Sequence, residues 1–341
     1  MSNKHRKHRK WLTMALLLAL LALTACGQSQ STSQGTDQTQ SGGETAQQET
    51  QFITIASGGT SGVYYQLAGT LAQLIEAQLG YKTSVQATGA SVENINLLMN
   101  DQAEIGFSIS DSATQAYEGT GPFEGQEPMT ELRAMAAIYP NVIQLVTTED
   151  SGIKTFEDLK GKRVSVGDRN SGTEINARMI FEAHGMTYDD VKVDYLSFGE
   201  SIDQIKNGMI DAAVISSGLP NSAIMDLSVT HKVRLIPISE SALNYLQEKY
   251  PFFMPMTIPA DMYDTAEDTQ TVKVANVLLV NPRLSEDVVY NLTKTIFDNL
   301  EALYSAHSAA KDIKLETVTE GLLVPLHPGA EKYFKEVGAI Q

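Results

Sequence analysis

The stretch 57-SGGTSGVYYQLAG-69 decides the fold, because a loop rich in glycine and hydroxyl side chains joins a strand to a helix there. The apolar run 52-FITIA-56 before it predicts a buried strand. Behind it, Leu67, Leu71 and Ile75 recur at a spacing of four residues, which predicts the buried face of a helix. The loop then lies at the carboxyl end of a strand and the amino end of a helix, where open α/β sheets bind their ligands.

The same order of strand, loop and helix recurs along the rest of the chain. Further strands are expected near 83–87, 104–109, 163–167, 191–196 and 211–216. The loops that follow four of them are 88-TGAS-91, 110-SDS-112, 168-DRNSGTE-174 and 217-SGLPN-221. A shift of 107 residues places Ser110 on Ser217 and Asn100 on Asn207, so the two halves are either one duplicated unit or two independent uses of a common pattern.

Alternating strands and helices predict an α/β protein with two lobes, each a mainly parallel sheet flanked by helices. Residues 52–141 are expected to form the first part of lobe 1, residues 142–232 to form lobe 2, and residues 233–341 to complete lobe 1. The glycine-containing loops of both lobes then face one another across a cleft. The cleft between the lobes is therefore the expected ligand site.

Residues 1–25 predict a lipoprotein signal peptide. The basic run 4-KHRKHRK-10 precedes the apolar block 11–25, which is too short to span a bilayer comfortably. The residues Leu-Thr-Ala before Cys26 resemble the lipobox of bacterial lipoproteins, which implies cleavage and lipid attachment at Cys26. Cys26 is the only cysteine and forms no internal disulfide, and the alternative is an ordinary signal peptide that happens to precede a cysteine.

Composition and charge separate a tether from an acidic body. Residues 26–51, which start with the expected lipidated cysteine, are rich in Gln, Ser, Thr and Gly and predict a disordered tether. The chain has 25 Lys and Arg against 41 Asp and Glu, and five of the basic residues lie in the signal, so the remainder has a net charge near −21. Such a chain repels nucleic acid and anionic lipid, and any anion site must be built locally.

Glycine and hydroxyl residues at helix amino ends suit an anion, because the first backbone N–H groups have no partner within the helix and carry a partial positive charge. Glycine also lets the backbone approach a ligand closely. The candidate ligand-binding residues in these loops are Ser57, Gly59, Thr60, Thr88, Ser91, Asn170, Ser171, Gly172 and Thr173. The alternative for Thr60, Thr88 and Asn170 is that each only caps its own helix.

Other candidates lie at strand ends or at the expected crossing between the lobes. They are Tyr64, Ser110, Asp111, Tyr139, Arg169 and Ser217. Tyr64 either points into the cleft or belongs to the core, and Tyr139 lies where its ring can wall a ligand. Asp111 either pairs with a ligand ammonium group or caps the next helix, and Arg169 either pairs with a second carboxylate or is an exposed loop residue. The two serines occupy matching positions of the repeated pattern.

No motif for nucleotide binding, metal binding or hydrolysis is complete. The loop 57–62 lacks the lysine of a P-loop and the spacing of a dinucleotide fingerprint. The histidines beyond the signal are far apart and form no metal-binding group. They are His184, His231, His307 and His327. A lipid-anchored hydrolase using Ser61 or Ser171 remains an alternative, although no motif places a histidine to activate either serine.

Several stretches together are similar to the TAXI-type solute-binding proteins of TRAP transporters. These stretches are 57-SGGTSGVYYQLAGTLA-72, 86-QATGASVENINLL-98, 138-IYPNVIQLV-146, 158-DLKGKRVSVG-167, 208-GMIDAAVISSGLPN-221 and 327-HPGAEKYFKEVG-338. The resemblance runs from Ile53 to about Gly338, and 168-DRN-170 is a point where the family often carries other residues.

The resemblance implies a two-lobed, periplasmic-binding-protein-like receptor that closes on a small organic acid and delivers it to a TRAP-type membrane permease. It implies a glutamate-like or other dicarboxylate ligand. The binding regions it implies are 57–64, 88–91, 110–111, Tyr139, 170–173 and Ser217. The alternative is a receptor for an ABC permease or a sensor. We expect a monomer on the outer side of the cell membrane, anchored by lipid on Cys26, with no cofactor, no metal and no nucleic-acid partner.

Overall fold

The computed structural model describes residues 51–341. The expected signal peptide at 1–25, the lipidation site Cys26 and all but the last residue of the tether at 26–51 lie outside the described residues. Within the described part, no helix is both long enough and apolar enough to cross a membrane.

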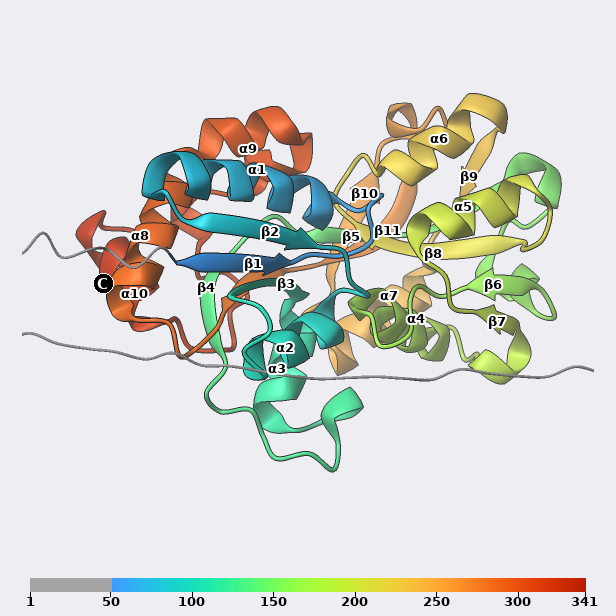
Figure 1. Cartoon of the computed structure of the whole chain (residues 1–341). Helices are drawn as coiled ribbons and strands as arrows, with labels where there is room; N and C mark the ends of the chain where they lie inside the picture. The colour runs from blue at the N-terminus through green and yellow to red at the C-terminus, as the bar shows by residue number, and fades with distance from the viewer. Residues whose placement is uncertain (1–50) are drawn as a thin grey trace, which may run out of the picture. The chain divides into compact units, whose positions relative to one another are not determined.

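The first sheet has the strand order β2-β1-β3-β12-β4 (Figure 1). The bounds are β1 Phe52–Ala56, β2 Lys82–Gln86, β3 Ile105–Ile109, β4 Arg133–Ala137 and β12 Asn276–Val280. Strand β1 pairs in parallel with β2 and β3, whereas β12 is antiparallel to β3 and β4. The strands predicted near 52–56, 83–87 and 104–109 are confirmed to within one residue.

The second sheet has the order β10-β11-β5-β8-β6-β7, and β9 also pairs with β5. The bounds are β5 Asn141–Thr148, β6 Arg163–Ser165, β7 Lys192–Asp194, β8 Ala212–Ser217, β9 Val233–Leu235, β10 Met254–Ile258 and β11 Thr269–Val274. Strand β6 is parallel to β7 and β8, and the other pairs are antiparallel. The order β7-β6-β8 repeats the order β2-β1-β3, so both sheets contain the same parallel unit.

Both sheets are mixed, and only the part built from strand–helix–strand units is parallel as predicted. Parallel neighbours need a crossover connection, which the helices supply. The antiparallel strands β4, β5, β11 and β12 adjoin the places where the chain passes directly from one sheet to the other without a helix. The sequence pattern predicts a strand at such a place but gives no direction for it.

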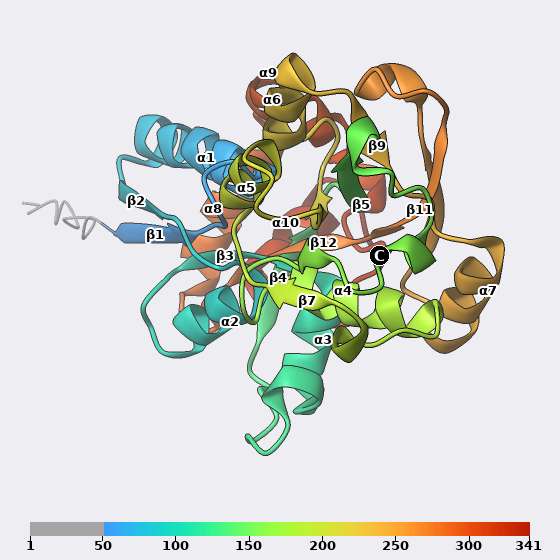
Figure 2. The same cartoon turned by 90° about the vertical axis from the view of Figure 1, so that its right-hand side faces the viewer.

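Helices cover both faces of each sheet (Figure 1, Figure 2). The helices of the first sheet are α1 Val63–Leu79, α2 Ser91–Met99, α3 Ser110–Glu118, α8 Glu286–Phe297, α9 Leu300–Ala306 and α10 Pro328–Glu336. Those of the second sheet are α4 Gly172–Ala183, α5 Phe198–Lys206, α6 Ser222–Thr230 and α7 Glu240–Lys249. The expected α/β arrangement of sheets flanked by helices is therefore present.

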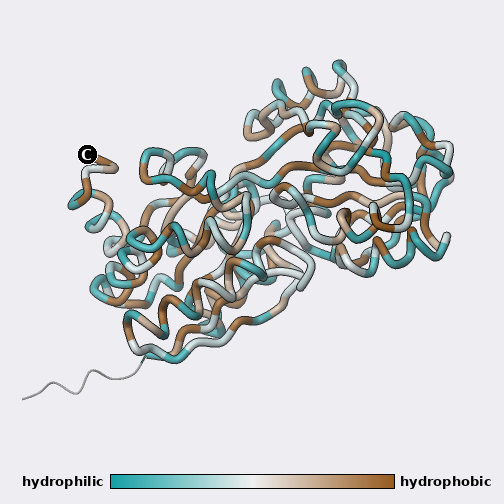
Figure 3. Tube along the Cα trace, turned by 90° about the horizontal axis from the view of Figure 1, so that it is seen from above, coloured by the Kyte–Doolittle hydropathy of each residue, from teal (hydrophilic) through white to brown (hydrophobic). Residues whose placement is uncertain are grey.

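Each sheet has a hydrophobic core on both faces, because side chains alternate along its strands. In β5, Ile143 and Leu145 pack in the core shared with α4 and α7, whereas Val142 and Val146 pack in the core shared with α5 and α6. Figure 3 shows apolar segments concentrated along the strands in the interior. Because the strands are buried on both faces, the cleft-facing loops are held by a rigid support.

The chain passes between the sheets at residues 138–140 and again at Ala275. We call these two segments the crossings. The run 271–280 forms two strands with only Ala275 between them, since β11 belongs to the second sheet and β12 to the first. Strands β9 to β11 also belong to the second sheet, so the expected return of the chain to lobe 1 at residue 233 is corrected to residue 276. A run of strand-forming residues without glycine or proline does not reveal a change of partner strands at its centre.

Candidate functional site

A cavity of about 40 Å³ lies between the two sheets, at the carboxyl ends of their parallel strands. Its walls are Gly58, Gly59, Gly62, Val63, Tyr64, Gly89, Ala90, Ser91, Ile109, Tyr139, Asn141, Asp168, Ser171, Gly172, Thr173, Phe198, Ser216 and Ser217. The residues predicted from the sequence among them are Gly59, Tyr64, Ser91, Tyr139, Ser171, Gly172, Thr173 and Ser217. We call it the cleft cavity, and it brings together loops from both sheets as the α/β pattern predicts.

The amino ends of α1, α2, α4 and α5 converge on the cleft cavity, since each contributes wall residues from its first turn or its N-cap. The N-cap residues of α1 and α2, Gly62 and Ala90, make no side-chain capping bond, so no N-cap side chain competes there for the first N–H groups. No lysine or arginine is among the wall residues. The helix ends are therefore the local source of positive potential.

Thr60, Thr88 and Asn170 neither cap their helices nor line the cleft cavity. The N-cap residues are Gly62, Ala90 and Ser171. Thr60 and Asn170 are exposed. The Thr88 hydroxyl donates to Asn94 Oδ1 at 2.6 Å and accepts from the backbone N–H of Ala90 at 3.0 Å, so it shapes the loop. The capping alternative is wrong for all three residues, because each of them lies one or two residues before the N-cap of the helix that follows.

A chain of buried hydrogen bonds joins the start of α1 to both crossings. The Tyr64 hydroxyl donates to Asn276 Oδ1 at 2.7 Å, and Asn276 Nδ2 donates to Asn141 Oδ1 at 2.8 Å. Asn141 Nδ2 in turn donates to the backbone carbonyl of Ser216 at 3.1 Å. Tyr64 is thus both a buried core residue and a wall of the cavity, which combines its two expected roles.

Two hydroxyl groups in the cavity wall have no hydrogen-bond partner within the described part of the chain. They are the Tyr139 hydroxyl and Ser216 Oγ, and both are fully buried atoms. Burial raises the pKa of Tyr139 well above its ordinary value, so this phenol stays protonated and can donate. Buried polar groups in folded proteins nearly always have a partner. A bound ligand is a partner that both hydroxyls can reach from the wall.

Asp168 is the one carboxylate in the cavity wall. Burial, with the nearby charges of Glu200 and Glu93, raises the pKa of Asp168. Glu93 Oε2 is held by the backbone N–H of Gly89 at 2.7 Å. On this side of the cavity Asp168 would repel an anionic group of the ligand and would attract an ammonium group or a hydroxyl.

Ser57 and Arg169 lie beside the cavity and do not line it. Ser57 is buried, and its hydroxyl donates to the carbonyl of Gln86 at 2.7 Å, which ties the loop to β2. The Arg169 guanidinium lies 3.8 Å from the centre of the Tyr195 ring on the exposed surface. Of the two expectations for Arg169, the exposed loop residue agrees with this position.

Ser110 and Asp111 lie in the first turn of α3, behind the cleft cavity. Ser110 Oγ donates to the carbonyl of Gly321. Asp111 Oδ2 accepts from Asn176 Nδ2 of α4 at 3.3 Å, so this contact links the first sheet's helix to the second sheet's helix. The capping alternative for Asp111 is wrong, because α3 begins at Ser110 and its N-cap is Ile109.

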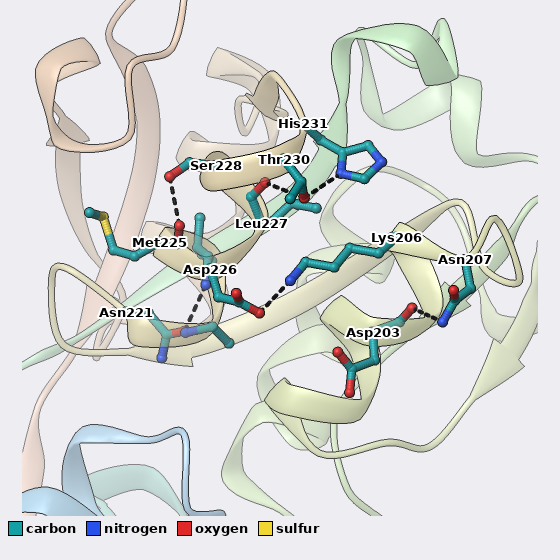
Figure 4. A network of polar contacts seen from close by, with 12 residues as sticks. Asp203, Lys206, Asn207, Asn221, Met225, Asp226, Leu227, Ser228, Thr230 and His231 are labelled. Atoms are coloured by element: carbon teal, nitrogen blue, oxygen red, sulfur yellow. Dashed lines mark hydrogen bonds and ion pairs between the residues drawn. The ribbon is translucent and has the colours of Figure 1, made fainter.

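The two sides of the cleft touch one another next to the cavity. The Ser61 carbonyl accepts from Ser222 Oγ at 2.9 Å and from Asn221 Nδ2 at 3.4 Å. Figure 4 shows Asn221 at the start of α6, which is tied to α5 by the ion pair of Asp226 with Lys206. The loop after β1 is thus bonded to the helices of the second sheet, and the cleft is closed in this structure.

Sequence reasoning missed the wall residues that act through the crossings. Asn141 is the first residue of β5 and Ser216 lies near the end of β8, and Asn276 holds Asn141 in place. Phe198 contributes the first helical residue of α5. The signal for Asn141 was its position directly after the expected crossing, and for Asn276 there was none, because it lay within an apparent single strand.

The histidines of the described part form hydrogen bonds with residues other than Ser61 and Ser171. His184 bonds to the Ile180 carbonyl, His231 to the Thr230 hydroxyl, His307 to the Pro220 carbonyl and His327 to the Leu284 carbonyl. Ser171 Oγ accepts from the N–H of Glu174 at 3.0 Å as the cap of α4. Within residues 51–341, no group of His, Cys, Asp and Glu side chains is placed to hold a metal ion. Among the hydrogen bonds of residues 51–341, none joins a histidine to Ser61 or Ser171.

Two solved structures are similar to this chain at low sequence identity. PhnD1 of Prochlorococcus marinus (MIT 9301), solved in complex with methylphosphonate, overlaps 85% of this chain and 99% of its own, with 10% identity and a TM-score of 0.54. A putative L-cystine ABC transporter from Listeria monocytogenes overlaps 77% of this chain and 98% of its own, with 15% identity and a TM-score of 0.47. The first likeness confirms the predicted two-lobed fold, and residues 55–338 match the NMT1-like family.

Proposed function

The chain belongs to the NMT1-like family, and on that premise we propose that it is the solute receptor of a membrane importer. The two sheets close on a small organic acid and bury it, without any chemical step. The receptor then hands the ligand to a permease in the membrane.

The convergence of helix amino termini on one buried cavity is the observation that supports this function most. Each terminus presents N–H groups without helical partners and the equivalent of about half a positive charge. The sequence carries a net charge of −16, so the potential that attracts an acid group must come from these termini. The unpaired hydroxyls of Tyr139 and Ser216 add donors for the same ligand.

The ligand class that we propose is a glutamate-like acid or another dicarboxylate. One carboxylate would meet the N–H groups at the starts of α1, α2 and α4. Asp168 on the opposite part of the wall favours a ligand that also carries an ammonium group. Methylphosphonate, the ligand named for the Prochlorococcus protein, is also a small anion, so phosphonates belong in the test.

The permease that we propose first is of the TRAP type, which the TAXI resemblance implies. A permease of the ABC type is the second candidate, and the family and the fold fit it at least as well. Uptake of the ligand in a host that carries this chain with one permease type at a time separates the two. Growth on the ligand with only one of them identifies the partner.

The direct test is a ligand panel measured on the intact chain by thermal unfolding and calorimetry. The panel contains glutamate, plain dicarboxylates, neutral amino acids, and mono- and dianionic phosphonates. A cleft ligand at 100 times its dissociation constant should stabilise the chain by about 2.7 kcal/mol. The proposal fails if the tightest acid is found by crystallography outside the cleft cavity, or if no small anion binds.

Replacing Tyr139 by Phe should weaken the tightest ligand about 5- to 10-fold, the effect of one lost hydrogen bond. The variant should unfold at the same temperature or higher without ligand, because it removes a buried hydroxyl that has no partner. Tyr333→Phe is the matched control: its hydroxyl bonds to Asp298 at 2.9 Å, so it should lose stability and keep affinity. Unchanged affinity in Tyr139→Phe would remove this hydroxyl from the site.

Replacing Cys26 by Ser tests the proposed anchor. Cys26→Ser should move the chain from the membrane fraction to the soluble fraction of cells and abolish labelling by a radioactive fatty acid, because the serine hydroxyl cannot form the thioether. Ser29→Ala is the control and should stay in the membrane fraction. Membrane retention of unlabelled Cys26→Ser would show that another segment holds the chain.

A further inference from the structure

A second cavity, of about 500 Å³, opens beside the two crossings. We call it the back groove and define it by Ile138, Pro140, Phe252, Lys273, Lys314 and Leu323. Small-molecule sites in proteins commonly enclose about 300–1,000 Å³. The back groove is therefore large enough for an organic ligand.

The back groove and the cleft cavity lie on opposite sides of the first crossing. Ile138 and Pro140 line the groove, whereas Tyr139 and Asn141 line the cleft cavity. Extended chain directs successive side chains to opposite sides, which accounts for this alternation. Ala275, the second crossing, also lines the groove.

The walls of the groove come from both sheets. Phe252 and Lys273 belong to the body of the second sheet, Lys273 as a residue of β11. Gly321 lies in a segment bonded to the first sheet, since its carbonyl accepts from Ser110 Oγ. The same segment is held by the Ala137 N–H, which donates to the Val318 carbonyl at 2.7 Å. A molecule in the groove therefore contacts both bodies at once.

The groove combines apolar walls with lysines that have no ion-pair partner among residues 51–341. Leu323 in its wall is 63% exposed, which is unusual for a large apolar side chain. Lys273 is half-buried, and neither it nor Lys314 belongs to any of the ion pairs of the described residues. Asp312, Lys314 and Glu320 line the groove as exposed residues, so Lys273 is the charged wall residue that is half-buried. These features fit an apolar body with one anionic group near Lys273.

We propose that the back groove binds a small amphipathic carboxylate and that its occupancy favours the closed cleft. The crossings lie between the cleft cavity and the back groove. A rotation about the crossings that opens the cleft cavity therefore brings the walls of the back groove together. A ligand that fills the groove opposes this rotation. Binding of the carboxylate in the back groove does not depend on the proposed function. The coupling between groove occupancy and cleft closure does rest on it.

Calorimetry with octanoate on the intact chain in lipid nanodiscs tests the binding, with empty nanodiscs titrated in parallel. Octanoate should bind, and octanamide, which has the same chain without the charge, should bind about tenfold more weakly or worse. Lys273→Gln should weaken octanoate by a similar factor, and Leu323→Glu should abolish binding, because it puts a negative charge in the groove. The exposed Lys232, outside the groove, gives the matched control Lys232→Gln, which should bind normally.

The coupling is measured by the distance between spin labels on Glu76→Cys and Val229→Cys in a Cys26→Ser background. Both positions are exposed, one on α1 and the other on α6. Octanoate alone should shift the distance distribution to the shorter, closed value, and it should tighten L-glutamate binding about fivefold or more.

Absent octanoate binding, or binding that is equal for octanamide and unaffected by Lys273→Gln, overturns the groove site. Octanoate that binds without changing the label distance overturns the coupling. A chain that closes with octanoate and ignores L-glutamate keeps the groove and instead contradicts the proposed glutamate-like ligand.

Discussion

Replacing Gly172 by Ala should weaken the cleft ligand about 10- to 100-fold while leaving the unliganded chain folded and equally stable. Gly172 is the first residue of α4 and lines the cleft cavity. A Cβ atom there would lie 2.6 Å from Ile109 Cδ1 and 2.7 Å from Ser91 Oγ, and both of these residues belong to the first sheet's side of the cleft. Both neighbours are buried, and Ser91 Oγ is fixed by the Ile109 N–H at 3.1 Å, so neither can easily give way.

The methyl group therefore obstructs closure and does not obstruct folding. In an open cleft the two sides separate, and alanine at the first turn of a helix is more favourable than glycine. Overpacking a buried site typically costs about 1–3 kcal/mol, which corresponds to the expected loss of affinity. Calorimetry with the tightest ligand of the panel measures this loss, and thermal unfolding without ligand measures the stability.

Gly69→Ala provides the matched control. Gly69 lies within α1, and a Cβ atom there would meet nothing within 4 Å. This variant should bind normally and gain up to about 1 kcal/mol of stability, because alanine restricts the unfolded chain. If Gly172→Ala binds as tightly as Gly69→Ala, then the cleft does not close on its ligand through this contact, and the closed geometry has no role in affinity.

The sequence predicted the parallel part of both sheets because local patterns determine it. Each strand there is an apolar run, followed by glycine or hydroxyl residues and then by a helix with a regular apolar face, as in 52-FITIA-56 and the residues after it. A helix between two strands supplies the crossover that parallel neighbours need, and the loops of such parallel units gather at one edge of the sheet. For this reason Ser91, Ser171 and Thr173 were found without any knowledge of the fold.

The crossings could not be predicted, because they depend on partners distant in the sequence. The run 271-TVKVANVLLV-280 contains no glycine or proline, so no turn residue marks the point at Ala275 where it leaves one sheet for the other. The roles of Asn141 and Asn276 follow from a hydrogen bond between residues 135 positions apart. Thr60 and Asn170 were misplaced for a related reason, since which loop residue becomes the helix cap is decided by the backbone path and not by residue type.

The buried carboxyl group of Asp111 is another feature that depends on tertiary contact. Among residues 51–341, its one side-chain partner is Asn176 Nδ2 at 3.3 Å, across the boundary between the two bodies, and its Oδ1 atom has no partner there. Burial raises the pKa of Asp111 from its ordinary value of 3.8 to about 7, against the smaller opposing effect of its hydrogen bonds. Asn176 Oδ1 also lacks a partner, so a protonated Asp111 has an acceptor of the right kind on the same neighbour.

Replacing Asp111 by Asn should therefore remove most of a pH dependence of stability between pH 4 and pH 7. In the wild type, the folded chain keeps a proton on Asp111 up to about pH 7, whereas the unfolded chain releases it near 3.8, so the folded state binds more protons in this window and stability falls as the pH rises. A shift of this size corresponds to a loss of up to about 4 kcal/mol by pH 8. Asn has the same shape without the charge and can donate to Asn176 Oδ1, so Asp111→Asn should be more stable than the wild type at pH 8 and equal to it near pH 4.

Urea unfolding of the wild type, Asp111→Asn and the exposed control Asp203→Asn, each at pH 4, 6 and 8, measures the effect. The control should follow the wild type at every pH. If Asp111→Asn is less stable than the wild type at pH 8, then the fold requires the ionised carboxylate. A buried ionised carboxylate would require a positively charged partner.

Asp111 joins the helices of the two bodies, so its ionisation should also loosen the closed cleft. The affinity of the tightest ligand should therefore fall from pH 6 to pH 8 in the wild type and not in Asp111→Asn.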